Sequence, residues 1–369
     1  MVKYIIMHTA LRRKDYYSMA KIRAAVLFGG VTKDHKISLV SAHSVLSGLS
    51  PEKYDITPIG ITKAGRWLYF PGDYSEIKDG TWENNSDCCS AIISPDPLHS
   101  GIITILDDGS TAFKRIDIVF SALHGKYGEG GRIQSLLKLS RIPYIDCNPD
   151  TAVYCMDKML THQILSSAGI EVPRYRLMER SDMNRIDEII ADIEKDLSYP
   201  VYVSATSCSS SIGANIAHNS AELKRGAKIA FSHHHTAIVE EQLNERTIDC
   251  VVLGNSYEIE VTPLGELIKT ESNSPFASYT GEYTVSTSLS PEETERIKAT
   301  AVKAFKILNF KGYAKMTFCI SGGRILLRRI ATIPGFTTES VLPILMKECG
   351  YSYPKALDRL AELALEMDS

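Results

Sequence analysis

The stretch 324–340, RILLRRIATIPGFTTES, contains the residues of this chain that are best suited to bind a charged ligand. It starts as an apolar strand and ends in a Pro-Gly loop, and Arg328 and Arg329 stand where the strand meets the loop. Guanidinium groups bind carboxylates and phosphates through paired hydrogen bonds. Because strand side chains alternate between two faces, at least one of the two arginines should face solvent. Ordinary solvated surface charges are the alternative interpretation.

A serine-rich segment, 207-SCSSSIG-213, lies between predicted strands at 199–207 and 236–242. Its small residues can present backbone N–H groups to phosphate, although the same composition suits a flexible linker. The three adjacent histidines 233–235 cannot all face one metal ion, so we interpret them as a solvated loop. His124 precedes a glycine at a strand end, where a substrate contact and a turn-stabilising role both remain open.

The first 147 residues alternate between strand and helix patterns. The apolar run 21–30 ends in a glycine pair, and helical spacing of apolar residues follows over 37–49. The pattern continues with strands at 54–62 and 116–125, a helix at 132–140 and a strand at 142–146. This part of the chain is therefore predicted to be an α/β layer, which binds ligands beyond the carboxyl ends of its strands.

The pattern changes near residue 147. A helix is expected at 155–169, and the serine-rich segment with its flanking strands follows it. The last third predicts a strand at 249–255, a polar loop at 271–288, a helix at 289–309, and strands at 312–320 and 323–331. Polar loops of that length are usually functional or mobile.

Composition excludes several classes of protein. The chain has 369 residues with 41 basic and 44 acidic side chains, and a net charge of -3 gives no reason to expect nucleic acid or an anionic membrane as a partner. The eight cysteines are scattered without CxxC pairs, which is typical of a reduced cytoplasmic protein. Residues 1–20 carry neither a signal-peptide core nor a membrane span and are expected to be an extension outside the fold.

Taken in order, several motifs resemble the D-alanine:D-alanine ligases, which are ATP-grasp enzymes of peptidoglycan synthesis. They are HGKYGEGGRIQSLL, CMDKMLTHQILSSAGI, YPVYVSATSCSSSIGA, VEEQLNERTIDCVVLGN, GYAKMTF and LLRRIATIPGFTTES, and the resemblance covers residues 21–368. PIGITKAGRWLYF and the tyrosine-bearing 280s loop look most like the vancomycin-resistance type that makes D-alanyl-D-serine.

The resemblance implies an α/β (α+β) ATP-grasp protein with three domains. These would be an N-terminal Rossmann-like parallel-sheet domain at 21–147, a central ATP-grasp subdomain at 148–240 and a C-terminal one at 241–369. It also implies a cytoplasmic homodimer that binds small molecules, with ATP and magnesium as cofactors. In such a ligase, ATP phosphorylates the carboxylate of one D-alanine, and the amine of a second D-amino acid attacks the acyl phosphate.

The magnesium ligands of the family are replaced in this chain. Where the family reads approximately N-E-V-N-T-L-P-G-F-T, the glutamate position holds Arg329 and the second asparagine position holds Ala331. The aspartate of a neighbouring strand is Thr317, and the arginine that steadies the reacting intermediate is Lys315. Because Arg329 takes a ligand position, we expect it to point inward. No carboxylate of the expected metal site remains.

The nucleotide and substrate positions divide into matches and replacements. Lys158 matches an ATP lysine, and Glu240, Glu241 and Leu243 match the hinge that meets adenine, whereas Ser204, Thr247 and Glu282 replace a lysine, a glutamate and another lysine. Lys36 stands where a glutamate receives the substrate ammonium. The remaining matched positions are His124, Ser210, Tyr279 and Gly335 among catalytic residues, Ser340 at the substrate and Ser211 at the nucleotide. Lys158 could equally pair along its own helix.

Three hypotheses follow. The first is a relative without the normal ligase reaction, which binds a nucleotide or another anion; the second is an active ATP-dependent D-alanine:D-alanine or D-serine ligase with substitute residues. The third is a structural protein with no small ligand. The missing metal carboxylates favour the first, since phosphoryl transfer relies on positioning and charge neutralisation.

Overall fold

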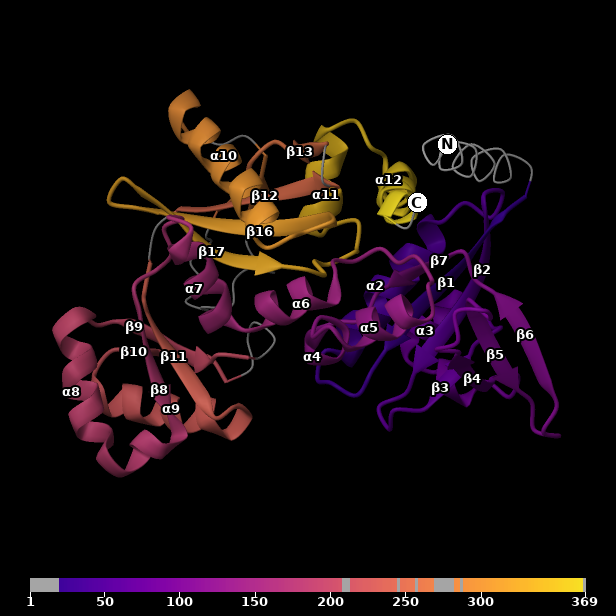
Figure 1. The fold of residues 1–369 in the computed structure, drawn as a ribbon, viewed down its shortest axis with the longest axis horizontal. Coiled ribbons are helices and arrows are strands. Elements are labelled where there is room, and N and C mark those ends of the chain that lie inside the picture. The colour runs from indigo at the N-terminus through magenta and orange to yellow at the C-terminus, as the bar shows by residue number, and fades with distance from the viewer. Residues whose placement is uncertain are drawn as a thin grey trace, which may run out of the picture. The chain divides into compact units, whose positions relative to one another are not determined.

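The computed structural model describes residues 20–207, 213–243, 246–255, 258–268, 282–285 and 288–367. Contacts divide the chain into two compact units (Figure 1). The described residues of the first fall within Met1–Pro149, Lys311–Tyr313 and Ile333–Ser369, and those of the second within Asp150–Phe310 and Ala314–Thr332. No described helix combines the length and the apolar composition of a membrane span.

The first unit is built on a seven-stranded sheet in the order β6-β5-β4-β3-β2-β1-β7. Its strands are β1 (Ile22–Gly29), β2 (Tyr54–Ile61), β3 (Trp67–Tyr69), β4 (Cys89–Ile93), β5 (Gly101–Ile105), β6 (Thr111–Arg115) and β7 (Ile118–Ser121). β1 pairs in parallel with β2 and β7, and the pairs from β2 to β6 are antiparallel. The predicted α/β class is confirmed, but the parallel part is confined to one side of the sheet. The links 62–66, 94–100 and 106–110 leave no room for a crossover helix, so the strands that they join pair antiparallel.

Helices cover this sheet. They are α2 (His35–Gly48), α3 (Tyr74–Asp79), α4 (Gly125–Gly128), α5 (Arg132–Leu139), α11 (Val341–Glu348) and α12 (Tyr353–Met367), with a short 3-10 turn at Trp82–Asn84. The strand predicted at 142–146 is wrong; the structure has only an isolated bridge between Val119 and Tyr144. Leu27, Ile59, Val119 and Leu137 belong to one buried apolar cluster, which shows that α5 packs on the sheet.

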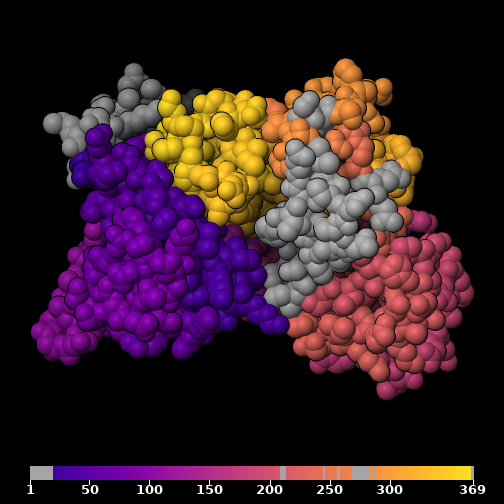
Figure 2. All heavy atoms as spheres, turned by 180° about the vertical axis from the view of Figure 1, so that it is seen from behind, coloured from indigo at the N-terminus to yellow at the C-terminus, as the bar shows by residue number. Residues whose placement is uncertain are grey.

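The C-terminal helix belongs to the first unit. Tyr54 donates a hydrogen bond from its hydroxyl to Asp358 of α12 at 2.7 Å, and α12 contacts α2. Figure 2 shows yellow C-terminal atoms directly beside the indigo N-terminal part of the chain. The contact depends on Gly48, because a Cβ there would lie 2.5 Å from the Tyr353 ring. Residues 333–369 therefore group with the N-terminal part of the chain rather than with 241–332. The division into three domains stays a prediction.

The second unit contains two sheets. A four-stranded sheet has the order β10-β9-β11-β8, and a six-stranded sheet has the order β15-β14-β12-β16-β17, with β13 paired to β12. The strands are β8 (Tyr175–Glu179), β9 (Val201–Ala205), β10 (Asn215–Ala217), β11 (Thr236–Glu241), β12 (Arg246–Gly254), β13 (Ile259–Val261), β14 (Gly265–Ile268), β15 (Glu282–Thr284), β16 (Gly312–Ser321) and β17 (Arg324–Ala331). The helices are α6 (Pro149–Met156), α7 (Lys158–Ser167), α8 (Ile186–Asp196), α9 (Ser220–His233) and α10 (Pro291–Ile307), with a 3-10 turn at Arg180–Arg185.

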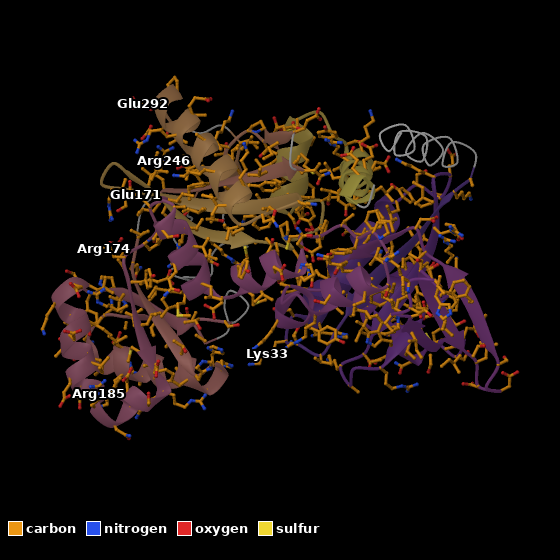
Figure 3. All side chains as sticks on the ribbon, viewed as in Figure 1. Lys33, Glu171, Arg174, Arg185, Arg246 and Glu292 are labelled. Atoms are coloured by element: carbon orange, nitrogen blue, oxygen red, sulfur yellow. The ribbon has the colours of Figure 1, made fainter. Side chains whose placement is uncertain are left out.

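Two helix starts in this unit show how sequence sets local structure. The single helix predicted at 155–169 is wrong, because Asp157 ends α6 and caps α7 by accepting hydrogen bonds from the backbone of Met159 at 2.9 Å and Leu160 at 3.2 Å. Lys158 thereby becomes the first residue of α7. At α10, Ser290 and Glu293 form a capping box, and Glu292 lies beside it at the end of the helix (Figure 3).

Candidate functional site

A buried carboxylate organises the charged residues of the four-stranded sheet. Glu240, at the end of β11, is 4% exposed and accepts a hydrogen bond from the Lys158 ammonium at 2.8 Å. The same ammonium donates to the Ser204 hydroxyl of β9 at 3.2 Å. The sequence named all three residues, and the structure brings them together.

The groups around Glu240 differ in charge. Burial raises the pKa of the Glu240 carboxyl, but the charge and the hydrogen bond of the Lys158 ammonium outweigh this effect, and the net shift is downward. For Lys158, burial lowers the ammonium pKa, but the attraction of Glu240 reverses the shift. Burial also lowers the pKa of His162, whose ring packs against that of Tyr175 with centroids 5.2 Å apart. Glu240 and Lys158 are therefore charged at neutral pH, and His162 is neutral.

The two arginines of β17 are exposed and buried in the opposite way to our expectation. Thr317 pairs with Arg329, and Phe318 pairs with Leu327, so Arg328 is the extra residue of a β-bulge. Arg329 is exposed, so the expectation that it points inward is wrong. Arg328 is half-buried instead, with its guanidinium 5.8 Å from the centre of the Tyr202 ring.

Asp249 lies where the resemblance places metal ligands. Its Oδ1 accepts a hydrogen bond from the Thr317 hydroxyl at 2.6 Å and lies 3.3 Å from the Lys315 ammonium. The sequence analysis did not find Asp249. Its position two residues after Thr247 on one strand was the available signal, because such residues share a face.

This set of donors does not suit magnesium. Ala331, opposite Lys315, supplies no side-chain oxygen, and the single carboxylate is already held by an ammonium. Magnesium requires octahedral oxygen coordination, usually with carboxylates beside the phosphates. Within the described part of the chain, no group of three or more His, Cys, Asp or Glu side chains is arranged to hold a metal ion.

The hinge residues are fixed by neighbours within the second unit. Glu241 accepts hydrogen bonds from the backbone N–H of Arg174 at 2.9 Å and from its side chain at 3.0 Å, and Arg324 adds bonds at 3.3 Å. Leu243 is buried in a small apolar cluster with Cys319 and Leu326. The sequence predicted the positions of Glu241 and Leu243, but not these partners.

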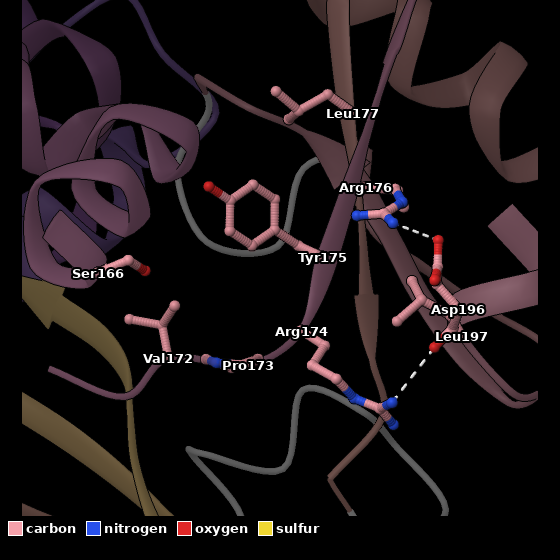
Figure 4. Close-up of a pocket in the computed structure, with 9 residues that line it drawn as sticks. All are labelled: Ser166, Val172, Pro173, Arg174, Tyr175, Arg176, Leu177, Asp196 and Leu197. Atoms are coloured by element: carbon pink, nitrogen blue, oxygen red, sulfur yellow. Dashed lines mark hydrogen bonds and ion pairs between the residues drawn. The ribbon is translucent and has the colours of Figure 1, made fainter. Parts of the chain in front are cut away.

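A separate pocket of about 620 Å³ opens on the outer side of β8 (Figure 4). Arg174 and Arg176 line it, and both bond to Asp196: Arg176 pairs with its carboxylate, and Arg174 donates to its carbonyl. Tyr175 lines the same pocket, and its ring is the one that covers His162. The pocket is thus next to the residues around Glu240, but the charges of its arginines are already matched.

In the first unit, His124 follows β7 and its ring contacts α2. It is 8% exposed, and its Nε2 lies 2.9 Å from the Ser41 hydroxyl of α2. Burial lowers the pKa of His124 to about 4, so the ring is neutral at pH 7. Gly125 follows with φ +74°, and a Cβ there would lie 2.2 Å from Asp34. A glycine is required at this turn.

The loop before α11 is similarly tight. A Cβ on Gly335 would lie 2.5 Å from the Ser340 hydroxyl, which shares a hydrogen bond of 2.7 Å with Thr337. Lys36, by contrast, is exposed on the first turn of α2, which agrees with the simple interpretation of a solvated charge. Ser210, Ser211 and Tyr279 lie outside the described residues, and of Glu282 only the strand backbone is described.

Comparison with known proteins identifies the family. Residues 23–147 match the D-ala D-ala ligase N-terminus, and residues 164–362 match the D-ala D-ala ligase C-terminus. The chain belongs to the D-alanine–D-alanine ligase family. This peptidoglycan-related family has the ATP-grasp fold, so the predicted fold and family are confirmed.

Relatives match along most of their length. A D-alanine–D-alanine ligase of Thermoanaerobacter is 36% identical over 358 residues, which cover 94% of this chain and 98% of the relative. The vancomycin/teicoplanin A-type resistance protein VanA of Enterococcus faecium is 33% identical and covers 94% of this chain and all of its own. The crystal structure of the VanG D-Ala:D-Ser ligase of Enterococcus faecalis superposes with a TM-score of 0.82 at 31% identity, over 94% of this chain and 100% of that chain.

Proposed function

We propose that this member of the D-alanine–D-alanine ligase family binds a nucleotide or another small anion but does not perform the normal magnesium-dependent ligase reaction. The observation that carries the proposal is the state of Asp249. Its carboxylate accepts a hydrogen bond from Thr317 and forms an ion pair with Lys315. A ligase of this family would need that region to hold a dication.

The charges in this region oppose a dication. An arginine about 5 Å from a divalent cation would repel it by roughly 6 to 7 kcal/mol at an effective dielectric of about 20, before screening and side-chain movement. Arg329 can lessen the repulsion by turning into solvent, because it is exposed. Lys315 cannot move as easily, because its ammonium is 3.3 Å from Asp249 and its side chain is 19% exposed.

The region expected to bind ATP also has less positive charge than the family pattern. With a serine at 204, Lys158 is the only one of the two expected ATP lysines that remains, and Glu240 already neutralises it. ATP would supply the phosphoryl group of the family reaction. In this chain, its phosphates would have to compete with Glu240 for Lys158.

The test is release of phosphate from ATP by the full-length protein with D-alanine, alone and with D-serine. We expect no release above the background measured without an amino acid. Steady formation of D-alanyl-D-alanine or D-alanyl-D-serine that is abolished by Lys158→Ala or His124→Ala would contradict the proposal.

An active ligase with substitute residues is the second candidate. The observation in its favour is that Asp249 supplies a carboxylate at a position the family motif does not use, while His124 and Gly335 keep their family identities. The same assay separates the two candidates, because only an active ligase would couple phosphate release to D-alanine.

We also propose a cytoplasmic homodimer. None of the described cysteines forms a disulfide, which agrees with a reducing compartment. For the dimer, α2 and α5 bury most of their apolar residues against their own sheet and leave Ile37, Val40 and Leu139 exposed. A dimer mass in solution scattering is expected; a monomer mass at all concentrations would mean that these helices serve only their own unit.

A further inference from the structure

The residues around Glu240 carry an unbalanced positive charge. We define the Glu240 cluster as Lys158, Tyr202, His162, Arg328 and Glu240. Glu240 and Lys158 form an ion pair at 2.8 Å. Arg328 adds a second cation but enters no ion pair of its own with a described carboxylate, while His162 is neutral. One carboxylate therefore faces two cations.

The two cations lie over the same aromatic ring. The Lys158 ammonium lies 4.6 Å and the Arg328 guanidinium 5.8 Å from the centre of the same Tyr202 ring. The two cations also repel each other: burial is the main effect that lowers the pKa of Lys158, and the charge of Arg328 lowers it further. The Lys158 side chain is 27% exposed and Arg328 is half-buried, so solvent reaches both.

Such an arrangement favours an oxyanion. A half-buried guanidinium offers several N–H donors in a fixed plane, and phosphate or carboxylate oxygens accept them in pairs. Partial burial weakens screening of the interaction by salt. The ring of Tyr202 stabilises both cations but cannot neutralise them.

We propose that Arg328 and Lys158 form a metal-free oxyanion site, and that Glu240 is its built-in competitor. The inference rests on the proposed function because it concerns the same nucleotide region, and it adds which residues bind and which one opposes binding. Arg328 is the extra residue of the β-bulge in β17, between the pairs Thr317–Arg329 and Phe318–Leu327.

The experiment titrates the full-length protein with inorganic phosphate by calorimetry, without magnesium, nucleotide or D-alanine. We expect Arg328→Gln to weaken phosphate binding about tenfold or more, since it removes a charge-assisted pair of hydrogen bonds. Arg328→Lys should retain part of the affinity. Glu240→Gln should strengthen binding several-fold, because glutamine still accepts a hydrogen bond from Lys158 but does not neutralise it.

Two variants provide the contrast. Arg329→Gln changes the exposed neighbour and should alter binding less than twofold, and Arg225→Gln changes a remote arginine of the same unit whose side chain is 75% exposed. Thermal unfolding of each variant shows whether it folds. Acetate and metal-free ATP, titrated in parallel, distinguish a general carboxylate site, a free-phosphate site and a nucleotide-phosphate site.

The proposal is overturned if Arg328→Gln binds phosphate as tightly as the unchanged protein, if Arg329→Gln or Arg225→Gln loses as much, or if Glu240→Gln weakens binding. It is also overturned if no titration shows binding. Because none of these titrations involves turnover, ligase activity would contradict the proposed function while leaving the contrast between Arg328 and Arg329 intact.

Discussion

The two units of this chain treat the family's functional positions differently. In the first, His124, Gly125, Gly335 and Ser340, which the resemblance matches to the family, are held by side-chain hydrogen bonds or by close side-chain approaches. In the second, the positions that would carry charge for phosphoryl transfer hold other residues, Ser204, Thr317, Arg329 and Ala331. Residues that also shape the backbone can persist without the reaction. Their presence is therefore weak evidence for activity.

In the second unit, buried carboxylates are neutralised by lysine and arginine side chains of the same unit. Four of its buried or half-buried acids each have a cation beside them. The pairs are Glu240 with Lys158, Glu241 with Arg174 and Arg324, Asp249 with Lys315, and Glu266 with Arg246. A protein with these pairs is stable without a dication, and a metal would have to break them.

The largest expected effect is on turnover. Assayed beside an active family ligase, this protein should be slower by about a thousandfold or more in D-alanine-dependent phosphate release, because groups that stabilise transferred charge are missing. Coupled phosphate detection over several hours measures it. Turnover within tenfold of the active ligase would remove the contrast between the units.

The next effect is on stability. Lys158→Ala should lower the free energy of unfolding by about 3 kcal/mol, because it leaves the Glu240 carboxylate buried without its ammonium. In the first unit, Ser41→Ala should cost only about 1 kcal/mol, since it removes one hydrogen bond to neutral His124. Urea unfolding of both variants tests the ranking, and equal losses would contradict it.

Restoring the family residues should recover magnesium-dependent ATP binding but not turnover. We expect the triple variant Thr317→Asp, Arg329→Glu, Ala331→Asn to make ATP binding magnesium-dependent, with affinity about tenfold higher when the metal is present. Turnover should stay absent while Ser204 and Lys36 remain. Calorimetry with calcium in place of magnesium serves as a control for general charge effects, and turnover by the triple variant would show that those two positions do not matter.

A further expected effect is a pH dependence of stability in the first unit. Burial lowers the pKa of His124 from 6.5 to about 4, so as the pH falls below 6.5 the unfolded chain takes up a proton that folded His124 does not. Stability is complete above 6.5 and falls by about 1.4 kcal/mol per pH unit towards 4. His124→Gln should reduce this slope between pH 6 and 4.5 in urea unfolding. An unchanged slope would mean that other groups set it.

Motifs allowed the sequence to predict the family and the fold class. Lys158, Ser204 and Glu240 were named separately, and they lie together because Asp157 starts α7 at Lys158 and because β9 and β11 are adjacent. Such positions can be predicted from the sequence because local signals, a helix cap and a strand pattern, determine them.

The remaining features depend on tertiary pairing that has no local signal. The bulge at Arg328 arises from the register between β16 and β17, and the family's ligand position had favoured Arg329 as the inward arginine. Asp249 meets Lys315 and Thr317 because β12 and β16 are neighbours in the sheet, although 66 residues separate Asp249 from Lys315 in the numbering. The antiparallel pairs β2–β3, β4–β5 and β5–β6 likewise follow from short links rather than from side-chain patterns.

The measurement that tests the central claim most directly is calorimetric titration of the unmodified protein with ATP, with and without magnesium. The charge arrangement around Asp249 and Glu240 predicts weak binding that magnesium does not strengthen. Tight ATP binding that depends on magnesium would show that the second unit still forms the metal site of an active ligase, and would contradict this account.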